Sequence, residues 1–96
     1  MKAKRIYCVV AYDVSLAKRR SKVIKVIEPY GRRVNFSVFE CMFTNAQLAS
    51  VKKKIKEIVI DGVDQVAIYP ICLSCYTKST YIPVRVDKFE KVRIFD

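Results

Sequence analysis

The sequence predicts an α+β domain in which an antiparallel sheet carries two helices on one face. Strand-like and helix-like stretches follow one another along the chain, and its 96 residues fit a single domain with one modest core. Hydrophobic residues make up 52% of the chain, with only two glycines and three prolines, which excludes a disordered protein. No internal repeat or linker is present, so we expect one domain over residues 1–96.

The first predicted strand and helix occupy the N-terminal third. Residues 5–12, RIYCVVAY, are rich in β-branched and aromatic side chains with little polar alternation, which favours a central strand buried on both faces. Apolar residues then recur at helical spacing, and Ser15 is the expected N-cap of that helix. Pro29 and Gly31 predict its end.

The middle of the chain predicts further strands and a second helix. Residues 32–44 alternate with a period of two, but the phase changes near Ser37, which indicates either a bulged strand or two strands in succession. Asn45 is the expected cap of the second helix, and Asp61 and Gly62 are expected to end it.

The last predicted elements complete a recognisable order. Residues 65–72 form another strand, in which Pro70 indicates an edge position or a strand end. The order β-α-β-β-α-β is the ferredoxin-like plan, with a core over about residues 5–75. A C-terminal strand over about residues 80–96 is expected to extend the sheet and to contact partners. The sheet face without helices needs cover, which a homodimer could supply.

The charge of the chain favours a nucleic-acid partner. Nineteen Lys and Arg against nine Asp and Glu give a net charge of +10. Such a charge can serve solubility alone, but a small basic domain is typical of proteins that bind phosphate backbones. No apolar run approaches the ~20 residues of a membrane span, and residues 1–15 lack the pattern of a signal peptide. We therefore expect a cytoplasmic protein.

Four cysteines raise the question of a metal or a disulfide. Cys8 lies in an apolar strand, where a free cysteine behaves as a small hydrophobic residue. Cys72 and Cys75 form one C-x-x-C pair, which is half of a zinc site without histidines to complete it. A metal or redox role for this pair stays open as the less favoured alternative.

Asp13 follows the first strand at its carboxyl end, where ligands often gather. The residue is either a helix-capping aspartate or a ligand. One carboxylate makes a poor Mg²⁺ site alone, but a symmetric dimer would place two carboxylates beside a substrate phosphate. A metal held in this way could activate water without a side-chain base, which suits a chain that has no histidine.

Three motifs together resemble one known family. The stretches AYDVSLAKRRSKV, YGRRVNFSVFE and VAIYPIC, within residues 5–75, are similar to the CRISPR-associated protein 2 family. The resemblance implies a ferredoxin-like homodimer and a metal-dependent nuclease that cuts single-stranded RNA or double-stranded DNA with Mg²⁺ or Mn²⁺. It also implies a place in spacer acquisition, as a bridge between dimers of the integrase, the CRISPR-associated protein 1 family.

The resemblance also assigns site residues. It implies Asp13 as the metal ligand and, with it, Arg20, Arg33 and Ser37 as catalytic residues. The nucleic-acid-binding candidates are Tyr12, Lys18, Arg19, Arg20, Lys22 and Arg33. Lys22 stands where some relatives have an arginine, so it keeps the charge but loses the bidentate fork. Phe39 is expected to be a core or dimer contact, because aromatic residues at strand periodicity are mostly buried.

Two functions follow from these assignments. In the first, the dimer is an endonuclease that needs Asp13 and a metal. In the second, the dimer is a non-catalytic architectural protein that binds duplex DNA through its backbone and bridges integrase dimers. A toxin-like ribonuclease is a third, less favoured class, since such an enzyme would be expected to use a histidine.

Overall fold

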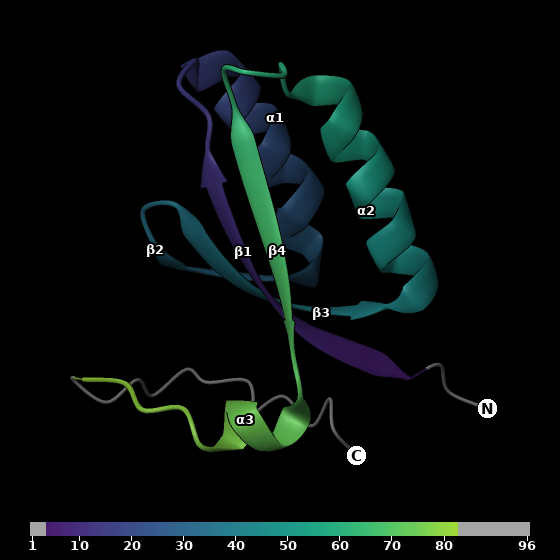
Figure 1. Ribbon diagram of the computed structural model, residues 1–96, viewed down its shortest axis with the longest axis vertical. Coiled ribbons are helices and arrows are strands. Elements are labelled where there is room, and N and C mark those ends of the chain that lie inside the picture. The colour runs from purple at the N-terminus through teal and green to yellow at the C-terminus, as the bar shows by residue number, and fades with distance from the viewer. Residues whose placement is uncertain (1–3, 83–96) are drawn as a thin grey trace.

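The structure, a computed structural model, describes residues 4–82. Their elements, in chain order, are β1 (Arg5–Asp13), α1 (Ala17–Ile27), the 3₁₀ turn η1 (Glu28–Tyr30), β2 (Gly31–Asn35), β3 (Val38–Thr44), α2 (Asn45–Ile58), β4 (Gln65–Ile71) and α3 (Leu73–Thr77). The strands form one antiparallel sheet in the order β2-β3-β1-β4. Helices α1 and α2 lie together on one side of it (Figure 1). The predicted ferredoxin-like βαββαβ arrangement is therefore confirmed.

The main core lies between the sheet and the two long helices. Alternation along the inner strand β1 directs Cys8, Val10 and Tyr12 toward the helices, where they are buried. Val23 on α1 and Val51 on α2 pack against them. The prediction of a central first strand is confirmed, whereas burial on both faces is confirmed only in part, because Val9 and Ala11 on the second face are partly exposed. Burial on the helix side gives the end of β1 a rigid support.

Both predicted helix caps were wrong by one position. Helix α1 begins at Ala17 after Leu16, which provides no side-chain cap, because the backbone stays extended beyond Ser15. Helix α2 is capped by Thr44, whose Oγ1 accepts from the Gln47 amide at 3.1 Å while Gln47 Oε1 accepts from the Thr44 amide at 2.9 Å. The end of β3 and the start of α2 thus share one residue in a reciprocal capping box.

The second predicted helix also ends earlier than expected. Helix α2 stops at Ile58, and Asp61 and Gly62 form the turn that follows it, with Gly62 at a φ of 79°. The phase change at Ser37 is the turn between β2 and β3, so the alternative of two successive strands is confirmed. A register irregularity between Arg33 and Asn35 lies in β2.

Pro70 occupies the penultimate position of β4, which is an edge strand, as its presence predicted. At the other edge, Gly31 begins β2 opposite Cys41 of β3. A Cβ at residue 31 would lie 1.9 Å from the carbonyl oxygen of Glu40, so β2 approaches β3 closely only because this residue is glycine.

The second face of the sheet is partly covered by α3, a helix that the sequence analysis did not predict. Tyr76 is 1% exposed and packs on Tyr7, with ring centroids 4.4 Å apart, and also joins Met42. Beyond α3, the Tyr81 hydroxyl donates to the buried carboxylate of Glu40. The chain after β4 therefore returns over the face opposite α1 and α2.

The expected C-terminal strand of about residues 80–96 lies, apart from its first three positions, outside the described residues. None of the helices within residues 4–82 has the length and apolar character needed to cross a membrane.

Candidate nucleic-acid and metal site

Asp13 is the last residue of β1 and is exposed. Alternation along β1 places it on the face opposite α1 and α2, next to Gln65 of β4 in the sheet register. Among residues 4–82, no side chain forms a hydrogen bond or ion pair with its carboxylate. The structure thus presents this carboxylate to solvent from the end of a buried strand.

Tyr12 fixes the neighbouring hairpin turn against β1. Its ring is 4% exposed in the core, and its hydroxyl donates to the carbonyl oxygen of Phe36 at 2.9 Å. The backbone N–H of Tyr12 donates to the carbonyl of Ser37 at 3.0 Å. These contacts bring exposed Ser37 close to the Asp13 end of β1. They favour a structural role for Tyr12, whose expected contact with nucleic acid stays a prediction.

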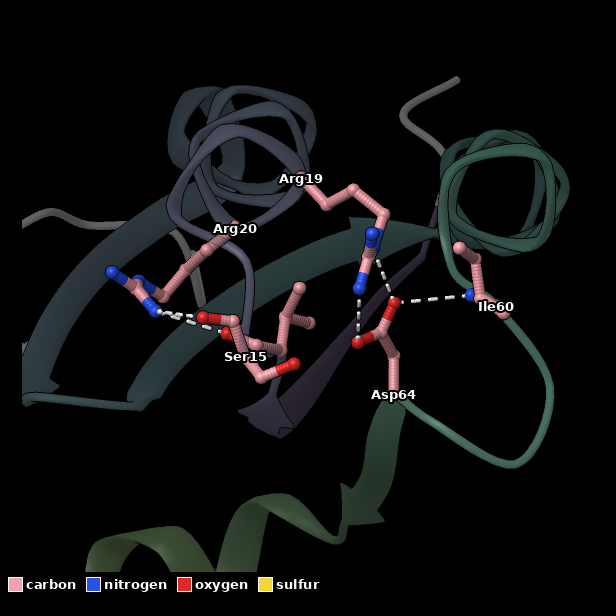
Figure 2. A network of polar contacts seen from close by, with 6 residues as sticks. Ser15, Arg19, Arg20, Ile60 and Asp64 are labelled. Atoms are coloured by element: carbon pink, nitrogen blue, oxygen red, sulfur yellow. Dashed lines mark hydrogen bonds and ion pairs between the residues drawn. The ribbon is translucent and has the colours of Figure 1, made fainter.

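Arg20 closes the loop that follows Asp13. Its Nη1 donates to the carbonyl oxygens of Val14 at 3.0 Å and Ser15 at 3.4 Å (Figure 2). Because this side chain comes from the first turn of α1 and reaches back to the loop, the Asp13 end of β1 and the start of α1 are held together. The residue is partly exposed, so an oxyanion can reach it.

Arg19, by contrast, points toward the α2–β4 loop. Its Nε and Nη2 donate to the two carboxylate oxygens of Asp64 at 2.7 and 3.1 Å, and the Ile60 amide donates to the same carboxylate at 3.0 Å (Figure 2). The Arg19 guanidinium holds the pKa of Asp64 below its ordinary value, with the Ile60 amide acting in the same direction. The pair occupies Nε and Nη2, so a phosphate that left it intact would have to approach Nη1.

Asp64 is the partner of Arg19 that sequence reasoning missed. The chain places it directly before β4, where an aspartate in a loop is ordinary, and only the fold brings it to α1. The pair joins the first turn of α1 to the loop before β4 and so supports the surroundings of Asp13 from a second side.

Arg33 and Phe39 lie elsewhere on the sheet. Arg33, on the edge strand β2, is exposed and has its guanidinium carbon 5.8 Å from the ring centroid of Phe39, which is buried in the core beneath the helices. By the strand alternation, Arg33 therefore belongs to the sheet face opposite to that of Asp13. The structure groups Asp13, Arg20 and Ser37 but leaves Arg33 apart from them.

Comparisons with known proteins place this arrangement in a family. The family model described as CRISPR associated protein Cas2 matches residues 6–79. The chain belongs to this family. The resemblance found from the three sequence motifs is thereby confirmed.

Two Cas2 relatives illustrate the similarity. A Rhodospirillum rubrum protein named CRISPR-associated endoribonuclease Cas2 4 is 34% identical over 80 residues, which cover 83% of this chain and 64% of that protein. A Chloroflexus aurantiacus protein named CRISPR-associated endoribonuclease Cas2 1 is 35% identical over 71 residues, covering 73% and 76%. The chain thus spans less than two thirds of the first of these relatives.

Solved Cas2 structures match the fold. Streptococcus pyogenes Cas2 aligns with a TM-score of 0.71 at 29% identity, covering 78% of this chain and 96% of that one. A chain of a partial Cas6-RT-Cas1–Cas2 complex aligns with a TM-score of 0.72 at 25% identity, covering 86% and 98%. This chain therefore shares its fold with Streptococcus pyogenes Cas2 and with a chain of that complex.

The helical side of this Cas2 domain is strongly basic. Exposed lysines occupy the outer surfaces of α1 and α2, and they are Lys18, Lys22, Lys25, Lys52, Lys53, Lys54 and Lys56. Ammonium groups act on phosphate mainly as point charges rather than as bidentate donors. These lysines can attract a nucleic-acid backbone, but contacts of this kind do not distinguish one base sequence from another.

Among residues 4–82 of one chain, the Asp13 site has too few ligands to hold a metal unaided. Within the described part of the chain, no three His, Cys, Asp or Glu residues gather as a metal-binding group. Mg²⁺ prefers oxygen ligands, keeps several waters and often needs only one or two protein carboxylates. Asp13 therefore fits a divalent cation only where a second chain or a phosphate supplies further oxygens.

Proposed function

We propose that this Cas2 chain acts in CRISPR adaptation as a homodimer that binds nucleic acid and hydrolyses phosphodiester bonds with Mg²⁺ or Mn²⁺. The observation that carries the proposal is the exposed Asp13, which no side chain of residues 4–82 pairs, at the end of a buried strand and beside a loop that Arg20 closes. Related Cas2 proteins are named endoribonucleases, and one from Thermus thermophilus is named an endonuclease.

The proposed site lies near a two-fold axis and uses Asp13 from each chain. A divalent cation bound there would supply an activated water and a polarised phosphodiester. The Asp13 carboxylates would hold that ion, and their position at the end of β1 keeps them fixed in relation to the core. Without a cation the two like charges would repel each other, so metal and dimer support each other in this proposal.

The other residues of the proposed site act on the substrate phosphate. Arg20 carries its charge on the loop next to Asp13 and can donate to a non-bridging oxygen with N–H groups that the loop does not use. The exposed hydroxyl of Ser37 lies in the turn beside Tyr12 and can add a neutral donor. Arg33 would contact the backbone away from the scissile bond, as would the lysines of α1.

Asp13→Asn provides the direct test, because it removes one charge and keeps the shape. Labelled single-stranded RNA and linear duplex DNA are incubated with wild type and variant, each with Mg²⁺, Mn²⁺ or EDTA, and cleavage is measured separately from binding. Glu28→Gln is the matched control, since Glu28 is exposed at the opposite end of α1. We expect Asp13→Asn to lose cleavage by about 100-fold or more while retaining binding, as removal of a catalytic group does.

Cleavage by Asp13→Asn at the rate of Glu28→Gln would exclude the nuclease mechanism. Cleavage that persists in EDTA would exclude the metal. Either result concerns cleavage alone, because binding is measured separately.

The second candidate function is an architectural dimer that holds duplex DNA and bridges integrase dimers. The basic outer surfaces of α1 and α2 favour it, because backbone binding needs charge but no reactive group. The structural match to a chain from a complex named for Cas1 and Cas2 also supports an integrase partner of the Cas1 family. In this case duplex binding falls steeply with salt, and Asp13→Asn still joins the integrase and supports spacer insertion.

A further inference from the structure

Cys72 and Cys75 form a pair of neighbouring thiols at the start of α3. Their Sγ atoms are 3.1 Å apart, and Cys72 Sγ lies 3.3 Å from the hydroxyl of Ser74. Both cysteines are free and exposed. A disulfide bond is about 2.0 Å long, so the two sulfur atoms need to approach by only about 1 Å to form one.

The two remaining cysteines differ from this pair in every respect that matters for reactivity. Cys8 and Cys41 face each other across β1 and β3 and are fully buried in the core. Burial raises the pKa of the Cys41 thiol to about 12 and raises that of Cys8 as well. These thiols are neither ionised nor accessible at neutral pH, so they behave as small hydrophobic residues.

Cys72 is placed to be the more nucleophilic member of the exposed pair. Hydrogen bonds from the Ser74 hydroxyl and then from Cys75 stabilise its thiolate and lower the pKa of Cys72 to about 7. The same interaction with Cys72 raises the pKa of Cys75. A thiol with a pKa near the ambient pH is an effective attacking group in exchange with disulfides.

We propose that Cys72 and Cys75 form a reversible thiol–disulfide site that reacts with low-molecular-weight disulfides of the glutathione type, with Cys72 attacking and Cys75 resolving. This site is independent of the proposed nuclease function, since Asp13 lies at the opposite end of the β1–β4 register.

The reaction proceeds in two exchange steps. The Cys72 thiolate attacks one sulfur of the small disulfide, forms a mixed disulfide and releases one small thiolate. Cys75 then loses its proton to solvent and attacks the Cys72 sulfur, which forms the Cys72–Cys75 disulfide and releases the second thiolate. The protein gives up two electrons, which reduce the small disulfide to two thiols, and an excess of the small thiol reverses both steps.

Oxidation would act on the turn that attaches α3 to the sheet. The Tyr76 amide donates to the Cys72 carbonyl at 3.0 Å, so the disulfide would span the same turn as this hydrogen bond. Tyr76 is the residue of α3 that covers Tyr7 on the second sheet face. The disulfide would thus restrain the helix that carries this cover.

The geometry favours thiol exchange over metal binding in one chain. The described residues offer no third Cys, His, Asp or Glu beside the pair, whereas structural zinc sites need four ligands. Zinc binding by the pair is therefore a distinct outcome that the experiment must detect.

The test uses the full chain, reduced and freed of reductant, then exposed to glutathione disulfide, quenched with acid and alkylated for mass spectrometry. We expect wild type to lose about 2 Da with Cys72 and Cys75 alone protected from the alkylating agent. Alkylation is carried out in denaturant, so that buried Cys8 and Cys41 become accessible and serve as internal controls that react in every sample. Excess glutathione should restore the dithiol.

Two variants assign the roles. Cys75→Ser should stop at the mixed disulfide on Cys72, with a mass gain of about 305 Da. Cys72→Ser should react about tenfold more slowly, because the remaining thiol is less ionised. Both side chains are exposed, and matching circular dichroism spectra of the two variants would show that the fold is retained.

Three outcomes would overturn the assignment. In the first, wild type stays a dithiol or accumulates the mixed disulfide. In the second, Cys72→Ser reacts as fast as Cys75→Ser. In the third, the pair resists alkylation only while zinc is present and becomes reactive once a chelator removes it.

Discussion

Replacement of Gly31 by alanine tests the close approach of β2 to β3. The φ of Gly31 is −175°, an extended conformation that any residue adopts, so backbone strain does not require glycine here. Lack of space requires glycine, because a Cβ would lie 1.9 Å from the Glu40 carbonyl oxygen and 2.7 Å from the Cys41 Cα. An ordinary contact is about 3.5 Å, so β2 and β3 would have to separate by roughly 1.5 Å.

The free energy of this change follows from which atoms must move. Both obstructing atoms belong to the backbone of β3, whose register is also fixed by β1, so no side-chain rotation relieves the contact. Overpacking of this kind costs about 1–3 kcal/mol, and we take the upper end because the backbone must shift. Alanine also lowers the conformational entropy of the unfolded chain, which stabilises the folded state by about 0.4–1 kcal/mol. The net loss is about 2 kcal/mol, or roughly 8–16 °C in Tm for a domain of this size.

Gly62→Ala is the matched control, because its steric situation is reversed. No atom of the described residues lies within 4 Å of a Cβ built on Gly62, but its φ of 79° is left-handed. That conformation costs an alanine about 1–2 kcal/mol, and the same unfolded-state effect offsets part of it, so the net loss is about 0.5–1 kcal/mol. Urea unfolding followed by circular dichroism gives both values. A smaller loss for Gly31→Ala than for Gly62→Ala would refute the steric reasoning.

Three further predictions concern the supports of the site and of the second sheet face. Asp64→Asn should lower stability at neutral pH. Arg19 holds the folded pKa of Asp64 below its unfolded value of about 3.9, so the extra stability of wild type over the variant is fully present above pH 3.9. This extra stability is lost as the pH falls through the lowered folded pKa. Urea midpoints of both proteins, measured as a function of pH, will show the loss. Tyr12→Phe should cost about 1 kcal/mol through the lost bond to Phe36, and an unchanged urea midpoint would contradict this. Tyr76→Ala removes a fully buried ring, a change that costs about 3–5 kcal/mol in a rigid core. Faster amide exchange in α3 and at the end of β1 that α3 covers would show that α3 no longer packs on the sheet.

Most of the sheet and both long helices were predictable, because hydrophobic periodicity records which face of each element is buried. The boundaries were not. Ser15 is a good capping residue, but the chain remains extended to Leu16, and Thr44 competes with Asn45 through a glutamine three residues later. Helix α3 escaped prediction because five residues are too few to show a helical period.

The candidate site was predictable only in part. Asp13 stood out because it directly follows a strongly apolar strand, and the structure places it at the end of β1. The engagement of Arg19 by Asp64 could not be read from the sequence, because the two residues are 45 positions apart and meet only in the folded chain. Likewise, the burial of Tyr12 depends on a hairpin turn whose position no local pattern records.

Arg20 has a consequence for the affinity and speed of ligand binding. When a ligand immobilises a free arginine side chain, the lost rotamer entropy costs at most about 2 kcal/mol. Arg20 has already lost much of that freedom through its bonds to the Val14 and Ser15 carbonyls, which use only Nη1. An anion that meets its remaining N–H groups encounters a donor whose direction is set in advance. The exposed lysines of α1, such as Lys22, must still be ordered by the ligand itself, so this loop would hold a phosphate longer than the helix beside it.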